Sequence, residues 1–192
     1  MELVPLVAFC IVIIGIILLI RNGGSPANGP YKRLVVNNRP YMVIKHHKNH
    51  VECAHLLNQV EQRLCQLVSH MSSKTTNELY SRMRERMRYT TFWESSKEDD
   101  HETFTRDKGE RMVFCTRDEG TGTLHDLNTL MFVGIHELAH VYSTSYHHTE
   151  EFWRNFKMLL KEGTSIGIYK PVDYSSTPTS YCKMTIQESP LF

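Results

Sequence analysis

The 192-residue sequence predicts a domain of the α+β class preceded by one membrane-spanning helix. Three observations lead to this prediction: an apolar run near the N-terminus, several stretches with apolar residues at helical spacing, and a short β-favouring segment. One domain of ordinary size with a short appendage accounts for the length. We expect a transmembrane anchor over residues 1–21, a flexible linker over residues 22–40 and a folded domain over residues 41–192.

The anchor is predicted from residues 3–20, which include no charged side chain. As a helix, this run would reach roughly 27 Å, enough for the hydrocarbon core of a thin bilayer. A cleaved signal peptide is the alternative, but the run is long for one and follows Glu2 rather than a basic segment. The cations Arg21, Lys32 and Arg33 come after the run, so the folded domain of this single-pass protein is expected in the cytoplasm.

The net charge and the spacing of the cysteines predict which partners the protein binds and whether its thiols are reduced. A formal net charge of +1 provides no global basic field, so nucleic acid is not expected as a partner. Four cysteines of the folded domain are dispersed without CxxC spacing, which predicts reduced thiols rather than a disulfide framework: Cys53, Cys65, Cys115 and Cys182. Reduced thiols agree with a cytoplasmic domain.

The secondary structure begins after a Gly-, Pro- and Asn-rich tether, "RNGGSPANGPYK", and a short extended segment, "RPYMVIKH". Residues 50–71 form an amphipathic helix with one buried stripe. Residues 77–89 form a second helix with Met83 and Met87 on one side. Residues 111–117, "RMVFCTR", are the best strand candidate, because they are rich in β-favouring residues.

A largely buried helix follows within residues 123–142, with Thr123 as its expected N-cap and Asp126 in the capping-box position. Gly134 is unusual inside a helix, and close approach of another element would explain it. The helix carries His136, Glu137 and His140. Two histidines four residues apart share one helix face and can bind one ion.

This HExxH pattern is the signature of zinc peptidases. Glu137 neighbours the first ligand and can accept a proton from the attacking water instead of binding the ion. Burying two imidazoles and a carboxylate without partners would lower the free energy of unfolding by roughly several kcal/mol, and a bound Zn²⁺ removes that cost. A catalytic zinc needs a third protein ligand, and His148 or His147 in the following loop can supply it. Thr149 is the expected N-cap of the next helix, with Glu150 and Glu151 in its first turn.

The stretch "HELAHVYSTSYHHTEEFW" resembles the WLM and SprT-like metallopeptidases, in which HExxH is followed after a short loop by His-x-x-x-Phe. His148, four residues before Phe152, fits that pattern. The resemblance covers roughly residues 48–162 and implies a zincin-like fold with a small sheet. It also implies peptide hydrolysis with Zn²⁺ on His136, His140 and His148, and with Glu137 as the catalytic base. A compact, anchored protein of this kind would suit a large DNA virus.

The resemblance further implies a protein or peptide substrate, held in extended form along the strand at residues 111–117. Tyr142, Tyr146, Tyr169 and Tyr181 are candidates to stabilise the oxyanion, and the sequence does not choose among them. The alternative function is a non-catalytic, membrane-anchored structural or interaction protein that keeps the zinc for folding.

Overall fold

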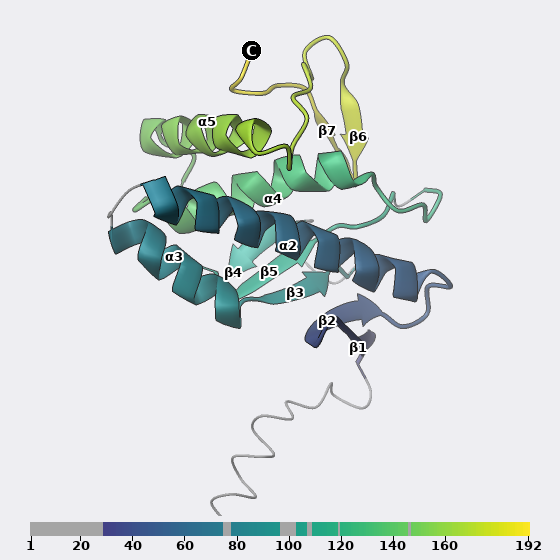
Figure 1. The fold of residues 1–192 in the computed structure, drawn as a ribbon. Helices are drawn as coiled ribbons and strands as arrows, with labels where there is room; N and C mark the ends of the chain where they lie inside the picture. The colour runs from purple at the N-terminus through teal and green to yellow at the C-terminus, as the bar shows by residue number, and fades with distance from the viewer. Residues whose placement is uncertain (1–28, 75–77, 97–102, 107–108, 119, 146) are drawn as a thin grey trace, which may run out of the picture.

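The computed structural model describes residues 29–74, 78–96, 103–106, 109–118, 120–145 and 147–192. Within these residues, four helices and small sheets give a mixed α+β architecture, which confirms the α+β part of the predicted fold class (Figure 1). The elements are, in chain order, β1 (Tyr31–Val36), β2 (Arg39–Ile44), α2 (His50–Lys74), α3 (Glu78–Tyr89), β3 (Thr91–Glu94), β4 (Phe104–Arg106), β5 (Arg111–Phe114), α4 (Leu127–Tyr142), α5 (Glu150–Ser165), β6 (Thr179–Tyr181) and β7 (Met184–Ile186).

The predicted membrane anchor at residues 3–20 lies outside the described residues. Among the residues that the structure describes, none of the helices combines the length and the apolar character that crossing a bilayer requires. The anchor therefore stays a prediction from sequence.

The main sheet has five strands in the order β1-β2-β3-β5-β4. β2, β3 and β5 run parallel, whereas the outer strands β1 and β4 are antiparallel to their neighbours. The sheet begins at Tyr31, inside the range expected to be linker. Asn37 and Asn38, with φ values of 50° and 62°, form the tight turn that joins β1 to β2. Two successive residues with positive φ are typical of the hairpin turns that match strand twist.

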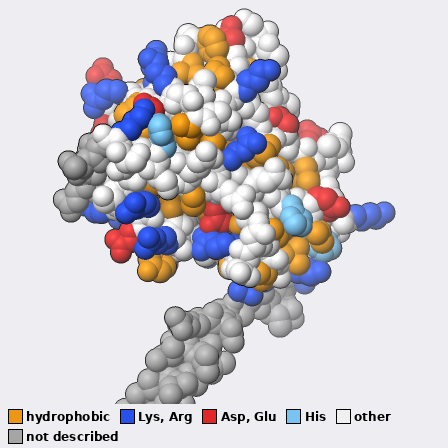
Figure 2. All heavy atoms as spheres, viewed as in Figure 1, with side chains coloured by type: hydrophobic (Ala, Val, Ile, Leu, Met, Phe, Trp, Pro, Cys, Tyr) orange, Lys and Arg blue, Asp and Glu red, His pale blue; other side chains and the backbone are white. Residues whose placement is uncertain are grey.

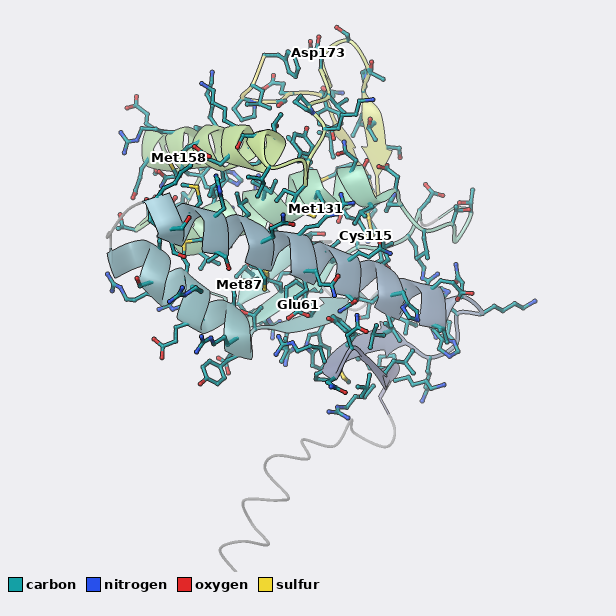
Figure 3. The ribbon with its side chains drawn as sticks, in the orientation of Figure 1. Glu61, Met87, Cys115, Met131, Met158 and Asp173 are labelled. Carbon is teal, nitrogen blue, oxygen red and sulfur yellow. A yellow bond between two sulfur atoms is a disulfide. The ribbon has the colours of Figure 1, made fainter. Side chains whose placement is uncertain are left out.

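The helices are stacked on one side of this sheet (Figure 1). α2 and α4 pack against each other and against the strands, and α5 packs on α4 farther from the sheet. The predicted close approach at Gly134 is confirmed, because a Cβ there would lie 3.3 Å from Leu64 Cδ1 of α2 and 3.5 Å from Phe114 of β5. In Figure 3, Met87 and Met131 point into this interior, where they are 5% and 0% exposed.

Local capping fixes where α4 and α5 begin. The prediction of Thr123 as the N-cap of α4 was wrong: Asp126 caps the helix, and its carboxylate accepts bonds from the backbone N–H (3.0 Å) and hydroxyl (2.6 Å) of Thr129. Asp at this position serves the same purpose, since it also satisfies an otherwise unpaired N–H. Thr149 caps α5, as predicted.

The C-terminal segment after α5 contains the β6–β7 hairpin, which is attached to the main sheet by a disulfide between Cys115 and Cys182. The prediction of reduced thiols was wrong for this pair. The two cysteines are 67 residues apart in sequence, and folding of the hairpin against the end of β5 brings them together. Cys53 and Cys65 are free thiols, as predicted.

Two ion pairs, each with a buried carboxylate, connect separate segments of the fold. On the β2-facing side of α2, Glu61 accepts a bond from Arg39 Nε (2.8 Å) and another from the Tyr41 hydroxyl (Figure 3). Glu94 pairs with Arg117 and also accepts the Ile44 backbone N–H at 2.7 Å. On the molecular face shown in Figure 2, acidic and basic side chains are interspersed, in keeping with the near-zero net charge.

Candidate metal centre

The three histidines predicted as ligands come together at one place. His136 and His140 lie one turn apart on α4, and His148 reaches them from the loop between α4 and α5. Their ligand atoms all lie within 4.8 Å of one another. His147 is exposed and does not belong to this group, so the geometry favours His148 over its neighbour.

The distances between the histidine ring nitrogens are close to those of nitrogens that bind one metal ion. His148 Nε2 is 3.1 Å from His140 Nε2 and 3.1 Å from His136 Nε2. One ring nitrogen holds either a proton or a lone pair, so His148 Nε2 cannot be a donor to one partner and an acceptor from the other at the same time. Nitrogens 2.0–2.1 Å from a tetrahedral zinc are about 3.3 Å apart. The arrangement therefore fits a divalent cation better than a set of mutual hydrogen bonds.

Glu151 fixes the loop that carries His148. Its carboxylate accepts bonds from the Thr144 backbone N–H (3.1 Å) and hydroxyl (2.9 Å) and from the Ser145 N–H (3.4 Å). These bonds lower the pKa of Glu151. Asn155 of α5 adds a buried bond of 3.0 Å to the hydroxyl of Ser143, the residue after α4. Glu151 therefore has a structural role, as its place in the first turn of α5 predicted.

Phe152 packs against all three imidazoles. The centroid of its buried ring is 4.9 Å from that of His136, 4.3 Å from that of His140 and 4.6 Å from that of His148. This contact gives a physical role to the His-x-x-x-Phe spacing: the phenylalanine in the first turn of α5 restricts the ring orientations of the ligands.

Burial favours the neutral form of two of the three imidazoles, those of His136 and His148. Burial, followed by the neighbouring His140 and His148, lowers the pKa of His136 to about 3. Burial, followed by the nearby His147, also lowers the pKa of His148. A neutral imidazole is the form that binds a metal ion. His136 and His148 are therefore ready to act as ligands at neutral pH.

Glu137 lies next to the histidines but makes a different contact. It is 5% exposed, and its Oε2 accepts a 2.8 Å bond from the hydroxyl of Thr105 on β4. Burial raises the pKa of Glu137 to about 7, against the effect of the Thr105 bond. Sequence reasoning missed Thr105, because nothing in "FTR" indicates which strand lies beside α4.

The strand at residues 111–117 does not border the site in the expected way. β5 is paired on both sides, with β3 and with β4, so its backbone cannot accept a substrate strand. β4 forms the edge of the described sheet instead. The prediction chose the most β-favouring segment, and central strands are the ones that carry the most apolar residues.

The candidate oxyanion tyrosines lie in packed surroundings. The Tyr142 ring stacks on Tyr80 at a centroid distance of 4.9 Å, and Tyr169 and Tyr181 are only 3% and 1% exposed. Tyr146 lies outside the described residues. Packing accounts for the three described rings.

Fold and site together define an α+β protein with a three-histidine candidate metal centre formed by its core helix α4 and the loop after it. The chain is 30% identical over 187 residues to the uncharacterized protein R325 of Acanthamoeba polyphaga mimivirus, covering 95% of this chain and 94% of that protein, and it belongs to the same family. It is also 28% identical over 146 residues to the uncharacterized protein 136R of Invertebrate iridescent virus 6, which covers 72% of this chain and 80% of that protein. No model of a known protein family matches the sequence.

Among solved structures, the chain is similar to Wss1 from Saccharomyces cerevisiae. The similarity covers 65% of this chain and 86% of that chain, with 14% sequence identity and a TM-score of 0.44. This likeness is too weak to carry a conclusion about fold or activity.

Proposed function

We propose that this protein is a zinc-dependent peptidase. The observation that carries the proposal is the convergence of His136, His140 and His148 nitrogens beside the buried carboxyl group of Glu137. Three nitrogen ligands with one position left open are the ligand set of catalytic zinc sites. A zinc ion bound there would act as a Lewis acid on the scissile carbonyl and on a water molecule.

The protein's own contribution is to hold and move a proton. Glu137 has a pKa of about 7, close to the value at which a carboxylate is an effective general base near neutral pH. In the proposed reaction it takes a proton from the attacking water and delivers it to the leaving amine. Thr105 keeps the Glu137 side chain oriented through its hydroxyl bond.

The exposure of the histidine cluster to solvent favours a catalytic metal site over a purely structural one. His148 is exposed, and His136 and His140 are half-buried, so solvent reaches one side of the ligand cluster. Structural zinc sites are normally closed by four protein ligands. The non-catalytic alternative is therefore the weaker of the two.

The substrate is proposed to add to the sheet at β4. The outer edge of this strand ends the described sheet, and Thr105 at its centre contacts Glu137. An extended peptide paired along β4 would thus lie next to the general base, and its backbone would supply most of the hydrogen bonds. The proposed substrate class is an extended protein or peptide segment.

The test compares zinc-loaded full-length protein with its Glu137→Gln variant on a proteome-derived peptide library, with new termini read by mass spectrometry. We expect cleavage to fall by a factor of about 10² or more, while zinc content and folding are retained. His148→Ala should lose zinc affinity, whereas His147→Ala serves as its matched control. Equal cleavage by wild type and Glu137→Gln would rule out the catalytic role, and so would the absence of any cleavage by zinc-loaded wild type.

Membrane attachment is part of the proposal. Residues 3–20 supply the apolar run, and the cations after it favour a cytoplasmic domain in a single-pass arrangement. Extraction of membranes at alkaline pH should leave the full-length chain in the pellet, and a chain lacking residues 1–21 in the supernatant. Release of both chains would contradict the anchor.

A further inference from the structure

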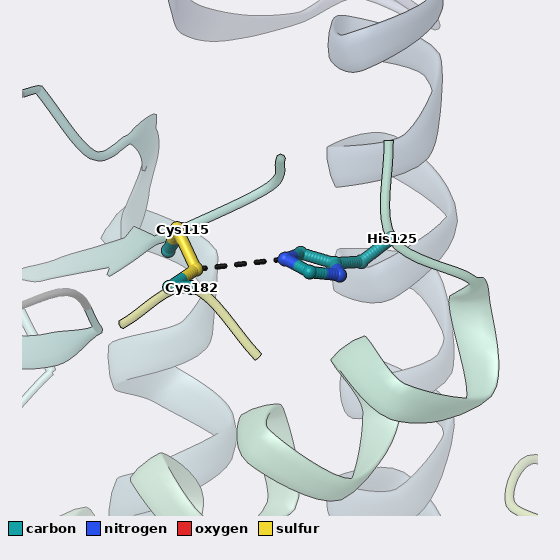
Figure 4. Close-up of side chains that lie close together, drawn as sticks. All are labelled: Cys115, His125 and Cys182. Atoms are coloured by element: carbon teal, nitrogen blue, oxygen red, sulfur yellow. Dashed lines mark hydrogen bonds between the residues drawn. A yellow bond between two sulfur atoms is a disulfide. The ribbon is translucent and has the colours of Figure 1, made fainter. Parts of the chain in front are cut away.

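A second cluster of metal-binding atoms lies at the start of α4, outside the three-histidine centre. Cys115, Cys182 and His125 offer two sulfur atoms and one ring nitrogen, all within 4.8 Å of one another (Figure 4). They come from three separate segments: the end of β5, the β6–β7 hairpin and the loop before α4. In the structure the two sulfurs form a disulfide, and His125 Nε2 lies 3.6 Å from Cys182 Sγ.

The position of His125 is fixed by its surroundings. Its backbone N–H donates to Thr116 O at 2.9 Å, and its ring packs on that of Tyr181 with 4.9 Å between centroids. The Tyr181 hydroxyl bonds to Thr103 Oγ1 at 2.6 Å, and this oxygen also accepts the Cys115 N–H at 3.0 Å. The three segments that carry the cluster are therefore connected by hydrogen bonds in addition to the disulfide.

The spacing matches that of zinc ligands. With Zn–S about 2.3 Å and Zn–N about 2.0–2.1 Å, a sulfur and a nitrogen on one tetrahedral zinc are about 3.6 Å apart. Cys182 Sγ and His125 Nε2 already have this separation. The Cα atoms of Cys115 and Cys182 are 6.4 Å apart, near the wide end of the range for bonded cysteines. Side-chain rotation after reduction can therefore separate the sulfurs without moving the backbone.

We propose that Cys115, Cys182 and His125 form a second zinc site when the disulfide is reduced. A dithiol reductant opens the S–S bond by delivering two electrons and two protons, and is itself oxidised to a disulfide. Zn²⁺ would then displace the two thiol protons to solvent and be held by two thiolates and the neutral imidazole, one protein ligand fewer than a structural zinc site normally has. The site thus exchanges a covalent connection between hairpin and sheet for a metal-mediated one.

The test measures zinc per full-length chain in detergent by elemental mass spectrometry. One sample is kept oxidised; the other is reduced with dithiothreitol, which is removed anaerobically before zinc is added and the excess dialysed away. We expect one additional zinc ion per chain in the reduced sample. Replacing zinc by Co²⁺ should add a thiolate-to-metal charge-transfer band in the reduced sample only. Equal zinc content in the two samples would overturn the proposal.

Variants assign the extra ion to its ligands. Cys182→Ser and His125→Ala should each abolish the additional zinc, and His125→Ala should still form the disulfide when oxidised, which reports correct folding. Cys65→Ser, which removes a half-buried free thiol, is the matched control and should keep the additional zinc. Additional zinc that persists in both His125→Ala and Cys182→Ser would also overturn the proposal. The difference between redox states is independent of the three-histidine centre, so failure of one proposal is distinguishable from failure of the other.

Discussion

Replacing Glu137 by Gln should change how the stability of the metal-free protein depends on pH. Glu137 is 5% exposed, and burial raises its pKa from an ordinary value of 4.5 to about 7. Folding therefore opposes its ionisation. Gln has nearly the same shape as Glu, can still accept a bond from the Thr105 hydroxyl and does not titrate. The substitution therefore removes only the pH-dependent free-energy cost of ionising a buried carboxyl group.

The sign and the size follow from linkage. Well below pH 4.5 the Glu137 carboxyl is protonated in both the folded and the unfolded chain, so it makes no pH-dependent contribution to the free energy of unfolding. Between pH 4.5 and 7 the unfolded chain loses this proton first, so the free energy of unfolding of the wild type falls as the pH rises. At 1.36 kcal/mol for each pKa unit, a pKa raised from 4.5 to about 7 corresponds to about 3 kcal/mol. His136, with its pKa lowered to about 3, adds an opposite dependence in both proteins, and this cancels in the difference.

The assay is urea unfolding of wild type and Glu137→Gln in the presence of a chelator, at several pH values from 4.5 to 7.5. Tryptophan fluorescence reports the transition. Relative to wild type, the variant should gain about 3 kcal/mol across this range. With zinc bound the gain should be smaller, because a nearby cation stabilises the carboxylate. A difference that stays constant with pH, or that runs in the opposite direction, would show that Glu137 is not a buried carboxyl with a raised pKa.

Three further substitutions test the core, the general base and the packing of α4. Glu94→Gln should lower the free energy of unfolding by about 3–5 kcal/mol in denaturant titration, since it leaves the buried Arg117 charge without its partner; a change below about 1 kcal/mol would contradict this. Thr105→Val should raise the pKa of Glu137 further and move the acidic limb of the kcat/KM–pH profile upward, because the lost bond favours the carboxylate; an unchanged limb would exclude a positioning role. Gly134→Leu should cost about 1–3 kcal/mol by overpacking against α2, measured by thermal unfolding, and a stabilised variant would refute the close approach.

The parts of the site that sequence could predict are those set by local geometry. Histidines four residues apart on a helix must share a face, so His136 and His140 follow from spacing alone. The Thr149 cap of α5 follows from a local preference for hydroxyl side chains at helix starts. His148 required the resemblance to choose it over His147, because a loop's path depends on contacts such as those of Glu151 with Thr144 and Ser145.

The parts that sequence could not predict depend on pairings between distant segments. Thr105 meets Glu137 only because β4 joins the edge of the sheet beside α4, and a three-residue strand has almost no pattern. The Cys115–Cys182 disulfide needs the C-terminal hairpin to pack beside β5. The β1–β2 hairpin is a different case. The Asn37–Asn38 pair between two β-favouring segments was a readable turn signal, although the Gly- and Pro-rich residues before it indicated a linker.

The disulfide and the proposed membrane topology favour different compartments. Cations after the apolar run favour a cytoplasmic domain, where thiols are normally kept reduced, whereas a Cys115–Cys182 bond is expected to persist in an oxidising environment. The position of His125 beside the cysteines makes the disulfide compatible with a cytoplasmic domain. In a reducing compartment the opened pair would still hold the hairpin against β5, because zinc on two thiolates and an imidazole connects the same segments. The residues around the pair would therefore connect hairpin and sheet under either redox condition. The redox state of Cys115 and Cys182 in cells that produce the protein would then report whether the domain lies in a reducing or an oxidising compartment.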